Sequence, residues 1–285
     1  MEDREELIEI ITRRVLAELD RDPEEECADC QGSCASHCPD KVRAMVDEGA
    51  SRIAYSGRGG DIPADVASYI DHTMLAPGTT GPQVDRLCEE ARRYNFAAVC
   101  VNPMWVRRCR DNLRGSKVRI ASVVGFPLGA NATETKVMEA RRALRDGARE
   151  IDMVINVGLL KEGDYQAVQQ DIARVADTCR EVGAICKVII EAALLTDEEK
   201  VVACQLAQEA KADYVKTSTG FGPGGATVYD VALMRETVGS AMGVKASGGI
   251  RTADDAEQMI GAGATRIGAS AGVSIVGGNG DENGH

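Results

Sequence analysis

Short apolar segments rich in β-branched residues alternate with longer amphipathic segments from about residue 69 onward. This alternation is typical of repeated βα units around a parallel sheet. The strands that the pattern predicts are Ser68–Met74, Ala97–Val101, Arg119–Phe126, Glu150–Val157, Lys187–Ala192, Tyr214–Ser218, Val244–Gly248 and Arg266–Ala269. The predicted helices between them include Val84–Tyr94, Glu134–Arg145, Tyr165–Glu181, Asp197–Glu209 and Ala253–Gly261.

Two folds share this alternation, the closed (β/α)8 barrel and the open doubly wound sheet. Eight strands in about 200 residues fit the barrel, and no glycine-rich dinucleotide fingerprint follows the first predicted strand. We therefore expect an α/β protein whose residues 64–277 form a (β/α)8 TIM barrel. Residues 278–285, which are mostly glycine, asparagine and acidic residues, are expected to be a disordered tail.

The first 63 residues do not follow the alternation and are expected to be an appended module. Residues 1–22 are predicted to be an amphipathic helix, because apolar residues recur at spacings of three and four at Ile8, Ile11, Val15 and Leu19. This helix resembles the encapsulation peptides that bind shell or cargo proteins of bacterial microcompartments. The alternative is that it packs on the barrel or forms an oligomer contact. Residues 23–63 are predicted to be a Cys-rich linker segment.

Composition and charge narrow the range of partners. The chain has 285 residues, is 44% hydrophobic and has a formal net charge of -12, so we expect neither a nucleic-acid partner nor an anionic membrane surface. The sequence contains no apolar run long enough to span a bilayer, and its acidic first residues differ from the start of a secretory signal. We therefore expect a cytoplasmic protein, in which cysteines are reduced.

The ten cysteines fall into two groups. Six are dispersed through apolar segments and are interpreted as small buried hydrophobic residues. The other four lie within 12 residues and provide thiolate ligands for a Zn or Fe–S site, although their spacing is not that of a standard zinc finger: Cys27, Cys30, Cys34 and Cys38. Disulfide formation and the absence of any ligand are the alternatives.

Lys216 and Lys245 are the strongest candidates for chemistry, because each lies in an otherwise apolar predicted strand. In a barrel both side chains are expected to point inward from adjacent strands, about 5 Å apart. Mutual repulsion and desolvation then both lower the pKa of one amine, and an uncharged amine is the nucleophile that Schiff-base chemistry needs. On the residues alone, a structural ion-pair role is the alternative hypothesis and the commoner one.

Other polar residues extend this candidate site. Asp152 lies in an apolar strand and is predicted to pair with a lysine or to shuttle protons. Lys187 and Glu191 share a strand face and are interpreted as a supporting ion-pair network. The glycine-rich ends of the seventh and eighth predicted strands lie where barrels commonly hold phosphate, although tight turns explain glycine as well.

Seven segments in order resemble the deoxyribose-phosphate aldolases, a family of DeoC-type class I aldolases. They are Ile70–Leu75, Val99–Pro103, Val123–Gly129, Glu134–Lys136 and the segments around Asp152, Lys216 and Lys245, and the resemblance covers about residues 64–277. It implies reversible cleavage of 2-deoxy-D-ribose 5-phosphate to acetaldehyde and D-glyceraldehyde 3-phosphate through a lysine Schiff base. No cofactor is expected for this catalysis.

The resemblance also implies roles for individual residues. Lys216 forms the imine, Lys245 lowers its pKa, and Asp152 assists proton transfer through water. Apart from the resemblance, Lys187 and Thr73 are expected to support the site. The residues that it places at the substrate phosphate are Gly220, Gly248, Gly249, Gly268 and Ser270. Ala76 and Ala271 depart from the residues common in the family, so phosphate affinity is expected to differ. His72 is expected to have a hydrogen-bonding role.

Two other functions remain as hypotheses. One is a related class I aldolase with a different acceptor, and the other is a catalytically silent barrel that acts as a scaffold or redox-sensing cargo. The presence of all three residues Lys216, Lys245 and Asp152 argues against a silent barrel. The expected partners are a small sugar-phosphate substrate, microcompartment shell or cargo proteins, and further copies of the chain in a dimer or tetramer.

Overall fold

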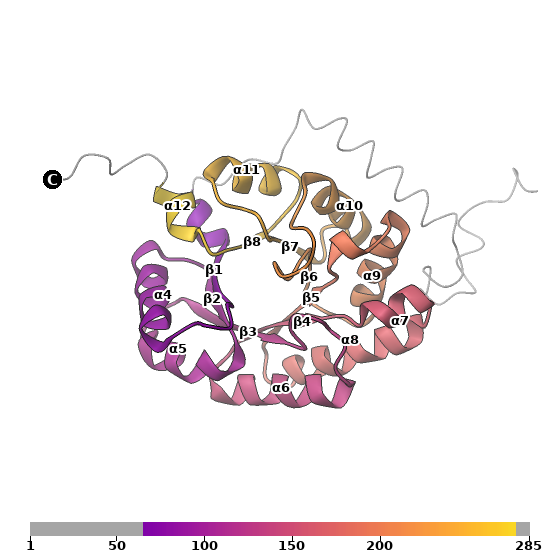
Figure 1. The fold of residues 1–285 in the computed structure, drawn as a ribbon, viewed down its shortest axis with the longest axis horizontal. Coiled ribbons are helices and arrows are strands. Elements are labelled where there is room, and N and C mark those ends of the chain that lie inside the picture. The colour runs from indigo at the N-terminus through magenta and orange to yellow at the C-terminus, as the bar shows by residue number, and fades with distance from the viewer. Residues whose placement is uncertain (1–64, 278–285) are drawn as a thin grey trace, which may run out of the picture.

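Eight parallel strands close into a barrel in the computed structural model, which describes residues 65–277 (Figure 1). Each strand pairs with the next in sequence, and β8 returns to pair with β1. The strands are β1 Ile70–Met74, β2 Ala98–Val101, β3 Arg119–Val124, β4 Glu150–Val154, β5 Ile185–Ile189, β6 Tyr214–Lys216, β7 Gly243–Ser247 and β8 Arg266–Ala269. The predicted (β/α)8 barrel is thereby confirmed.

Helices surround the barrel as an outer layer and connect successive strands (Figure 1). The α-helices are α4 Gly81–Tyr94, α5 Val106–Asn112, α6 Thr133–Asp146, α7 Val157–Glu162, α8 Tyr165–Arg180, α9 Asp197–Glu209, α10 Val228–Val238, α11 Ala253–Gly261 and α12 Gly272–Gly277. Short 3-10 helices are η2 Val66–Tyr69, η3 Pro103–Trp105 and η4 Ala192–Leu194. None of the helices in this described part of the chain is long and apolar enough to cross a bilayer.

The structure differs from the predicted elements where local patterns are weak. We did not predict α10, because most of its residues are buried on every side and it lacks a one-sided apolar stripe. The helices α7 and α12 have six residues each, too few to display a helical period. The strand predicted at Lys187–Ala192 instead spans Ile185–Ile189, because the backbone of Glu191 is left-handed and starts η4.

The strands have an apolar outer face and a largely polar inner one. On β4 the outward residues Ile151 and Met153 join the core between barrel and helices, while Glu150 and Asp152 point inward. A second, smaller apolar cluster lies around Cys100, Ala121 and Val123. The interior therefore has an apolar side at β2 and β3 and a charged side formed mainly by the other strands.

The predictions for residues 1–22, for residues 23–63 with their cysteine cluster, and for the tail at 278–285 lie outside the described residues. The structure therefore bears on the barrel alone, and those predictions stand as they were made from the sequence.

Candidate active site

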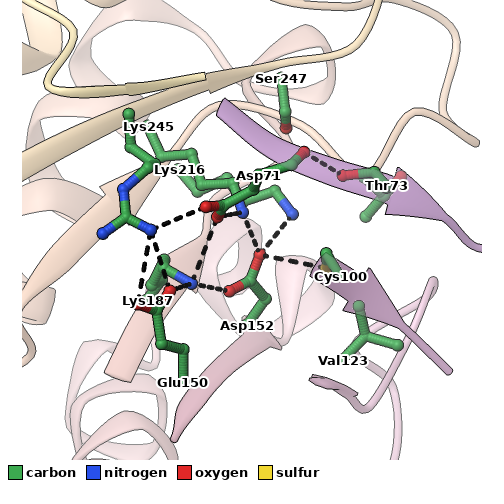
Figure 2. Close-up of polar contacts among 12 residues, drawn as sticks. Asp71, Thr73, Cys100, Val123, Glu150, Asp152, Lys187, Lys216, Lys245 and Ser247 are labelled. Carbon is green, nitrogen blue, oxygen red and sulfur yellow. Dashed lines mark hydrogen bonds and ion pairs between the residues drawn. The ribbon is translucent and has the colours of Figure 1, made fainter. Parts of the chain in front are cut away.

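Seven ionisable side chains meet inside the barrel, and all of them are buried (Figure 2). Three are carboxylates and four are basic. They are Asp71, Glu150, Asp152, Lys187, Lys216, Lys245 and Arg266. Strand alternation explains the gathering, because each stands at an inward position next to at least one outward apolar residue. Burying so many charges requires that they pair with one another.

Asp152 is the centre of this network. Its Oδ2 atom lies 2.8 Å from Nζ of Lys216 and 2.8 Å from Nζ of Lys245. Its Oδ1 atom accepts a hydrogen bond of 2.7 Å from Lys187, its register partner on β5. Lys216 and Lys245 are themselves register partners on β6 and β7. The three predicted residues therefore lie together, and the carboxylate stands between the two amines.

The basic groups differ in how many carboxylates they contact. Lys187 lies 2.6 Å from Glu150, 2.7 Å from Asp152 and 3.6 Å from Asp71. Lys245 lies 2.5 Å from Asp71 in addition to its contact with Asp152. Among the ion pairs of the described residues, Lys216 has Asp152 alone, which it shares with both other lysines. The Lys216 amine is therefore the least compensated cation of the network.

Their pKa values follow from these environments. Burial lowers the pKa of Lys216, attraction to Asp152 opposes this, repulsion from Lys245 adds to the lowering, and the net shift is downward. Burial also acts to lower the pKa of Lys245, but attraction to Asp152 and Asp71 outweighs it and the net shift is upward. For Asp152, burial is outweighed by the surrounding lysines, and its pKa falls well below 3.8. The resting arrangement is an ionised Asp152 beside a charged Lys245 and a Lys216 amine that loses its proton more easily than an ordinary lysine does.

A cavity of about 550 Å³ opens beside Lys216 at the carboxyl ends of the strands. In (β/α)8 barrels this end carries the active site. Lys216, Thr73, Ala76 and Ser247 line the cavity, and Thr73 donates a hydrogen bond of 2.8 Å to the carbonyl of Asp71. The walls also include all five residues expected at the phosphate: Gly220, Gly248, Gly249, Gly268 and Ser270.

Glycine is favoured at positions along this wall for two different structural reasons. Gly248 and Gly249 have φ values of +91° and +83°, in the left-handed region that glycine favours. Gly268 instead makes room, because a Cβ there would lie 3.0 Å from Cε of Lys245 and 2.8 Å from Cβ of Ser247. Gly268 therefore has a packing role beside Lys245, as well as its place on the cavity wall.

Sequence reasoning missed three members of the charged network, namely Asp71, Glu150 and Arg266. Asp71 accepts hydrogen bonds from Lys245 at 2.5 Å and from Arg266 at 2.7 Å, so it links β1, β7 and β8. The signal that singled out Lys216, a charged residue within an apolar strand, is weaker at these positions. Glu150 and Arg266 are the first residues of their strands, and Asp71 is followed by the polar His72. Cys100 is the fourth addition, with Sγ 3.9 Å from Asp152, and burial raises its pKa to about 11.

Two further predictions concern residues beside the site. Glu191 does not lie beside Lys187 as expected, because its left-handed backbone (φ 53°) turns the carboxylate towards Thr219, whose backbone N–H and hydroxyl donate to it. His72 has the expected hydrogen-bonding role, with Nε2 2.7 Å from Glu90. Among the described residues no His, Cys, Asp or Glu side chains group as metal ligands, and the predicted cysteine site lies outside that range.

This geometry provides a specific chemical capability. A buried amine that loses its proton readily faces a cavity of sufficient size for a small phosphorylated sugar, and an ionised carboxylate lies within hydrogen-bonding distance of it. An uncharged amine attacks carbonyl carbon, and the adjacent carboxylate accepts or returns protons.

The chain is similar to known aldolases. The profile of the DeoC/LacD family of aldolases matches residues 66–277. A deoxyribose-phosphate aldolase of Thermococcus kodakarensis is 60% identical over 220 residues, which cover 76% of this chain and 98% of the relative. One from a Geobacillus species is 59% identical over 212 residues, covering 74% and 95%. A solved structure described as a tetrameric deoxyribose phosphate aldolase from Aeropyrum pernix has 34% identity and a TM-score of 0.71, covering 82% of this chain and 96% of that one.

Proposed function

The chain belongs to the DeoC/LacD family of aldolases, and from this premise we propose that its reaction proceeds through a Schiff base on Lys216. The reaction is the reversible cleavage of 2-deoxy-D-ribose 5-phosphate to acetaldehyde and D-glyceraldehyde 3-phosphate. The observation that carries the proposal is the contrast between two adjacent lysines: Lys216 lines the cavity and has one shared carboxylate, whereas Lys245 has two carboxylate partners.

The covalent steps begin at the aldehyde carbon, C1, of the open-chain sugar phosphate. The lone pair of the Lys216 nitrogen attacks C1, and one proton moves from the nitrogen to the carbonyl oxygen to give a carbinolamine. The Asp152 carboxylate, 2.8 Å from Nζ, carries that proton, directly or through a water molecule. A second proton, taken up from solvent, lets the hydroxyl leave as water and leaves a protonated imine.

The imine then accepts the electrons of the breaking carbon–carbon bond. Deprotonation of the C3 hydroxyl forms the carbonyl of glyceraldehyde 3-phosphate, the bond between C2 and C3 breaks, and its electron pair forms an enamine on Lys216. Protonation at C2 restores an imine, and water hydrolyses it to acetaldehyde and the free amine. The ammonium of Lys245, 2.8 Å from Asp152, keeps that carboxylate ionised and helps to lower the pKa of the Lys216 amine, which favours its uncharged form.

The phosphate of the substrate is placed at the glycine-rich wall of the cavity. The left-handed turns at Gly220, Gly248 and Gly249 present backbone without side-chain atoms, so that a phosphate can approach N–H groups closely. Ser270 adds a hydroxyl-bearing residue at the end of β8. The aldehyde end of a substrate held there points to Lys216, across the same cavity.

Trapping of the imine tests this mechanism directly. The full chain is incubated with acetaldehyde and sodium borohydride, digested and mapped by mass spectrometry. We expect an ethyl group on Lys216 and none in a Lys216→Met variant. An ethyl group on Lys245 alone, or the absence of any adduct together with undiminished cleavage of the sugar phosphate, would contradict the proposed nucleophile.

We also propose that residues 1–63 determine location and assembly without taking part in the aldol steps. The resemblance of residues 1–22 to encapsulation peptides supports a cytoplasmic enzyme that is enclosed in a bacterial microcompartment.

The four-thiol motif at residues 27–38 supports a Zn or Fe–S site, which metal analysis of anaerobically purified protein tests. The tetrameric Aeropyrum pernix relative supports a homo-oligomer, and light scattering tests it.

A further inference from the structure

Four strands begin with polar side chains that meet at the amino-terminal end of the barrel, opposite the cavity. We call these four residues the floor of the barrel. They are Arg119, Glu150, Tyr214 and Arg266, the first residues of β3, β4, β6 and β8. One guanidinium nitrogen of Arg266 lies 3.1 Å from Glu150 and 2.7 Å from Asp71, and Cζ of Arg266 lies over the Tyr214 ring, 5.6 Å from its centroid. Arg119 lies 3.3 Å from Glu150 and is largely exposed to solvent.

Two continuous chains of ion pairs connect this floor to the catalytic amine. One runs from Arg266 to Glu150, then to Lys187 at 2.6 Å and on to Asp152 at 2.7 Å. The other runs from Arg266 to Asp71, then to Lys245 at 2.5 Å and on to Asp152 at 2.8 Å. Both chains end at the carboxylate that contacts Lys216. Figure 2 shows the convergence of these contacts on Asp152.

The charges of the interior balance in one protonation state. Asp71, Glu150 and Asp152 supply three negative charges, and the bases Lys187, Lys245 and Arg266 supply three positive charges. Lys216 is the seventh group, so the buried network is neutral when the Lys216 amine is uncharged. Net charge in a low-dielectric interior is costly, which makes the neutral state the favoured one.

We propose that Arg266 and Glu150 are positioning residues of the aldolase site, which balance the charge of the barrel interior and thereby keep the Lys216 amine uncharged. This inference rests on the proposed role of Lys216 as nucleophile. Neither residue lines the cavity, so both act through Lys187, Asp71 and Asp152. The alternative is that the pair only fills the floor of the barrel, in which case its loss lowers stability and leaves the titration of Lys216 unchanged.

All eight strands contribute a titratable or charged group to the environment of Lys216. Those on other strands are Asp71 on β1, Cys100 on β2, Arg119 on β3, Glu150 and Asp152 on β4, Lys187 on β5, Lys245 on β7 and Arg266 on β8; Tyr214 shares β6 with Lys216. Arg119 is screened by solvent because its side chain is 54% exposed, and the thiol of Cys100 stays protonated because burial raises its pKa to about 11. The remaining buried groups decide the balance.

The sign of the effect differs between the two floor residues. In Arg266→Gln three carboxylates face Lys187 and Lys245, so the network is neutral only when Lys216 is protonated, and its titration moves to higher pH. In Glu150→Gln two carboxylates face three permanent cations, and the titration of Lys216 moves to lower pH. A unit charge about 10 Å away in a protein interior shifts a titration by about one pH unit. The double variant Glu150→Gln, Arg266→Gln restores the balance and should titrate like the wild type.

The experiment follows the titration of Lys216 by two readouts in the full-length enzyme. One is the pH dependence of kcat/KM for 2-deoxyribose 5-phosphate, and the other is the rate at which an amine reagent, trinitrobenzenesulfonate, labels Lys216 in the absence of substrate, mapped by mass spectrometry. At a pH below the titration, Arg266→Gln should lose about tenfold in both rates, and Glu150→Gln should gain about tenfold in labelling. Arg266→Lys retains the positive charge and should keep the wild-type titration.

Opposite shifts in the two single variants, cancelled in the double variant, support the inference. Shifts in the same direction, or unchanged titration in folded variants, overturn it. If Arg266→Gln does not fold, Glu150→Gln and the double variant still decide, since the first must titrate below the wild type and the second with it. The labelling readout does not depend on aldol chemistry, so failure of the wild type to form an imine refutes the proposed function and leaves this test intact.

Discussion

Replacement of Lys245 by methionine separates its electrostatic role from a general contribution to stability. Methionine retains the length of the side chain and removes its charge. In the variant, Asp71 keeps Arg266 at 2.7 Å and Asp152 keeps Lys187 at 2.7 Å, so neither carboxylate is left without a partner. The remaining charges balance only when Lys216 is protonated. We therefore expect the Lys216 amine to titrate at higher pH in Lys245→Met.

The size of this shift follows from the geometry of Asp152. Nζ of Lys216 and Nζ of Lys245 each lie 2.8 Å from the same oxygen, so the two nitrogens are at most 5.6 Å apart, twice that distance. At an effective dielectric constant of about 20, two positive charges at that separation repel by about 3 kcal/mol, which corresponds to about two pH units. The variant should therefore lose about 100-fold in kcat/KM on the acid side of the profile.

The assay is the pH profile of kcat/KM for 2-deoxyribose 5-phosphate in wild type and Lys245→Met, with thermal unfolding measured on the same samples. Activity of the variant should recover progressively as the pH is raised. Lys136→Met is the matched control, because Lys136 is equally buried and is paired with Asp171 at 2.5 Å outside the cavity wall. It should lower stability without moving the profile. A uniform loss of activity at every pH in Lys245→Met would refute the electrostatic argument.

Three further predictions concern the carboxylates and the phosphate wall. Asp152→Asn should lower kcat by about 10²–10⁴-fold, because Asp152 transfers protons. It should also move the titration of Lys216 to lower pH, because Asp152 raises the pKa of Lys216. An unchanged kcat across the pH profile would contradict the first expectation. Gly249→Ala should raise KM for the phosphorylated sugar more than for 2-deoxyribose, whereas Gly183→Ala, an equally open left-handed glycine away from the cavity, should change neither value. The surrounding cations outweigh burial and hold the pKa values of Asp71 and Asp152 below 3.8. The stability that these carboxylates contribute is therefore complete above pH 3.8 and is lost as the pH falls through their pKa values in the folded protein. The unfolding temperature should drop steeply in that acidic range, and less steeply in Asp152→Asn.

The sequence alone could predict the barrel and the position of the reactive amines, since each strand carries its own signal. Alternation around Lys216 and Lys245 identifies an inward face without any knowledge of the neighbouring strands. Which side chains on other strands contact those lysines is not encoded in any single strand. Arg266 meets Asp71 across 195 residues and Glu150 across 116, and only the register of a closed barrel brings them together. Glu191 shows the opposite case, in which the local pattern predicts a contact that does not form. Alternation along the strand places Glu191 on the same face as Lys187, but its left-handed backbone turns it away.

The structure also supplies a physical reason for choosing between the two lysines, which the repulsion argument could not do. Repulsion is symmetric and lowers the pKa of either amine equally. The asymmetry comes from the carboxylates: Asp71, on β1, contacts Lys245 and leaves Lys216 with a share of Asp152. In the closed strand order β1 follows β8, so it is three strands from β6, which carries Lys216, and two strands from β7, which carries Lys245. It follows that removing the Asp71 carboxylate, as in Asp71→Asn, should narrow the difference in pKa between the two amines. Labelling of Lys245 by the amine reagent should then begin to compete with labelling of Lys216.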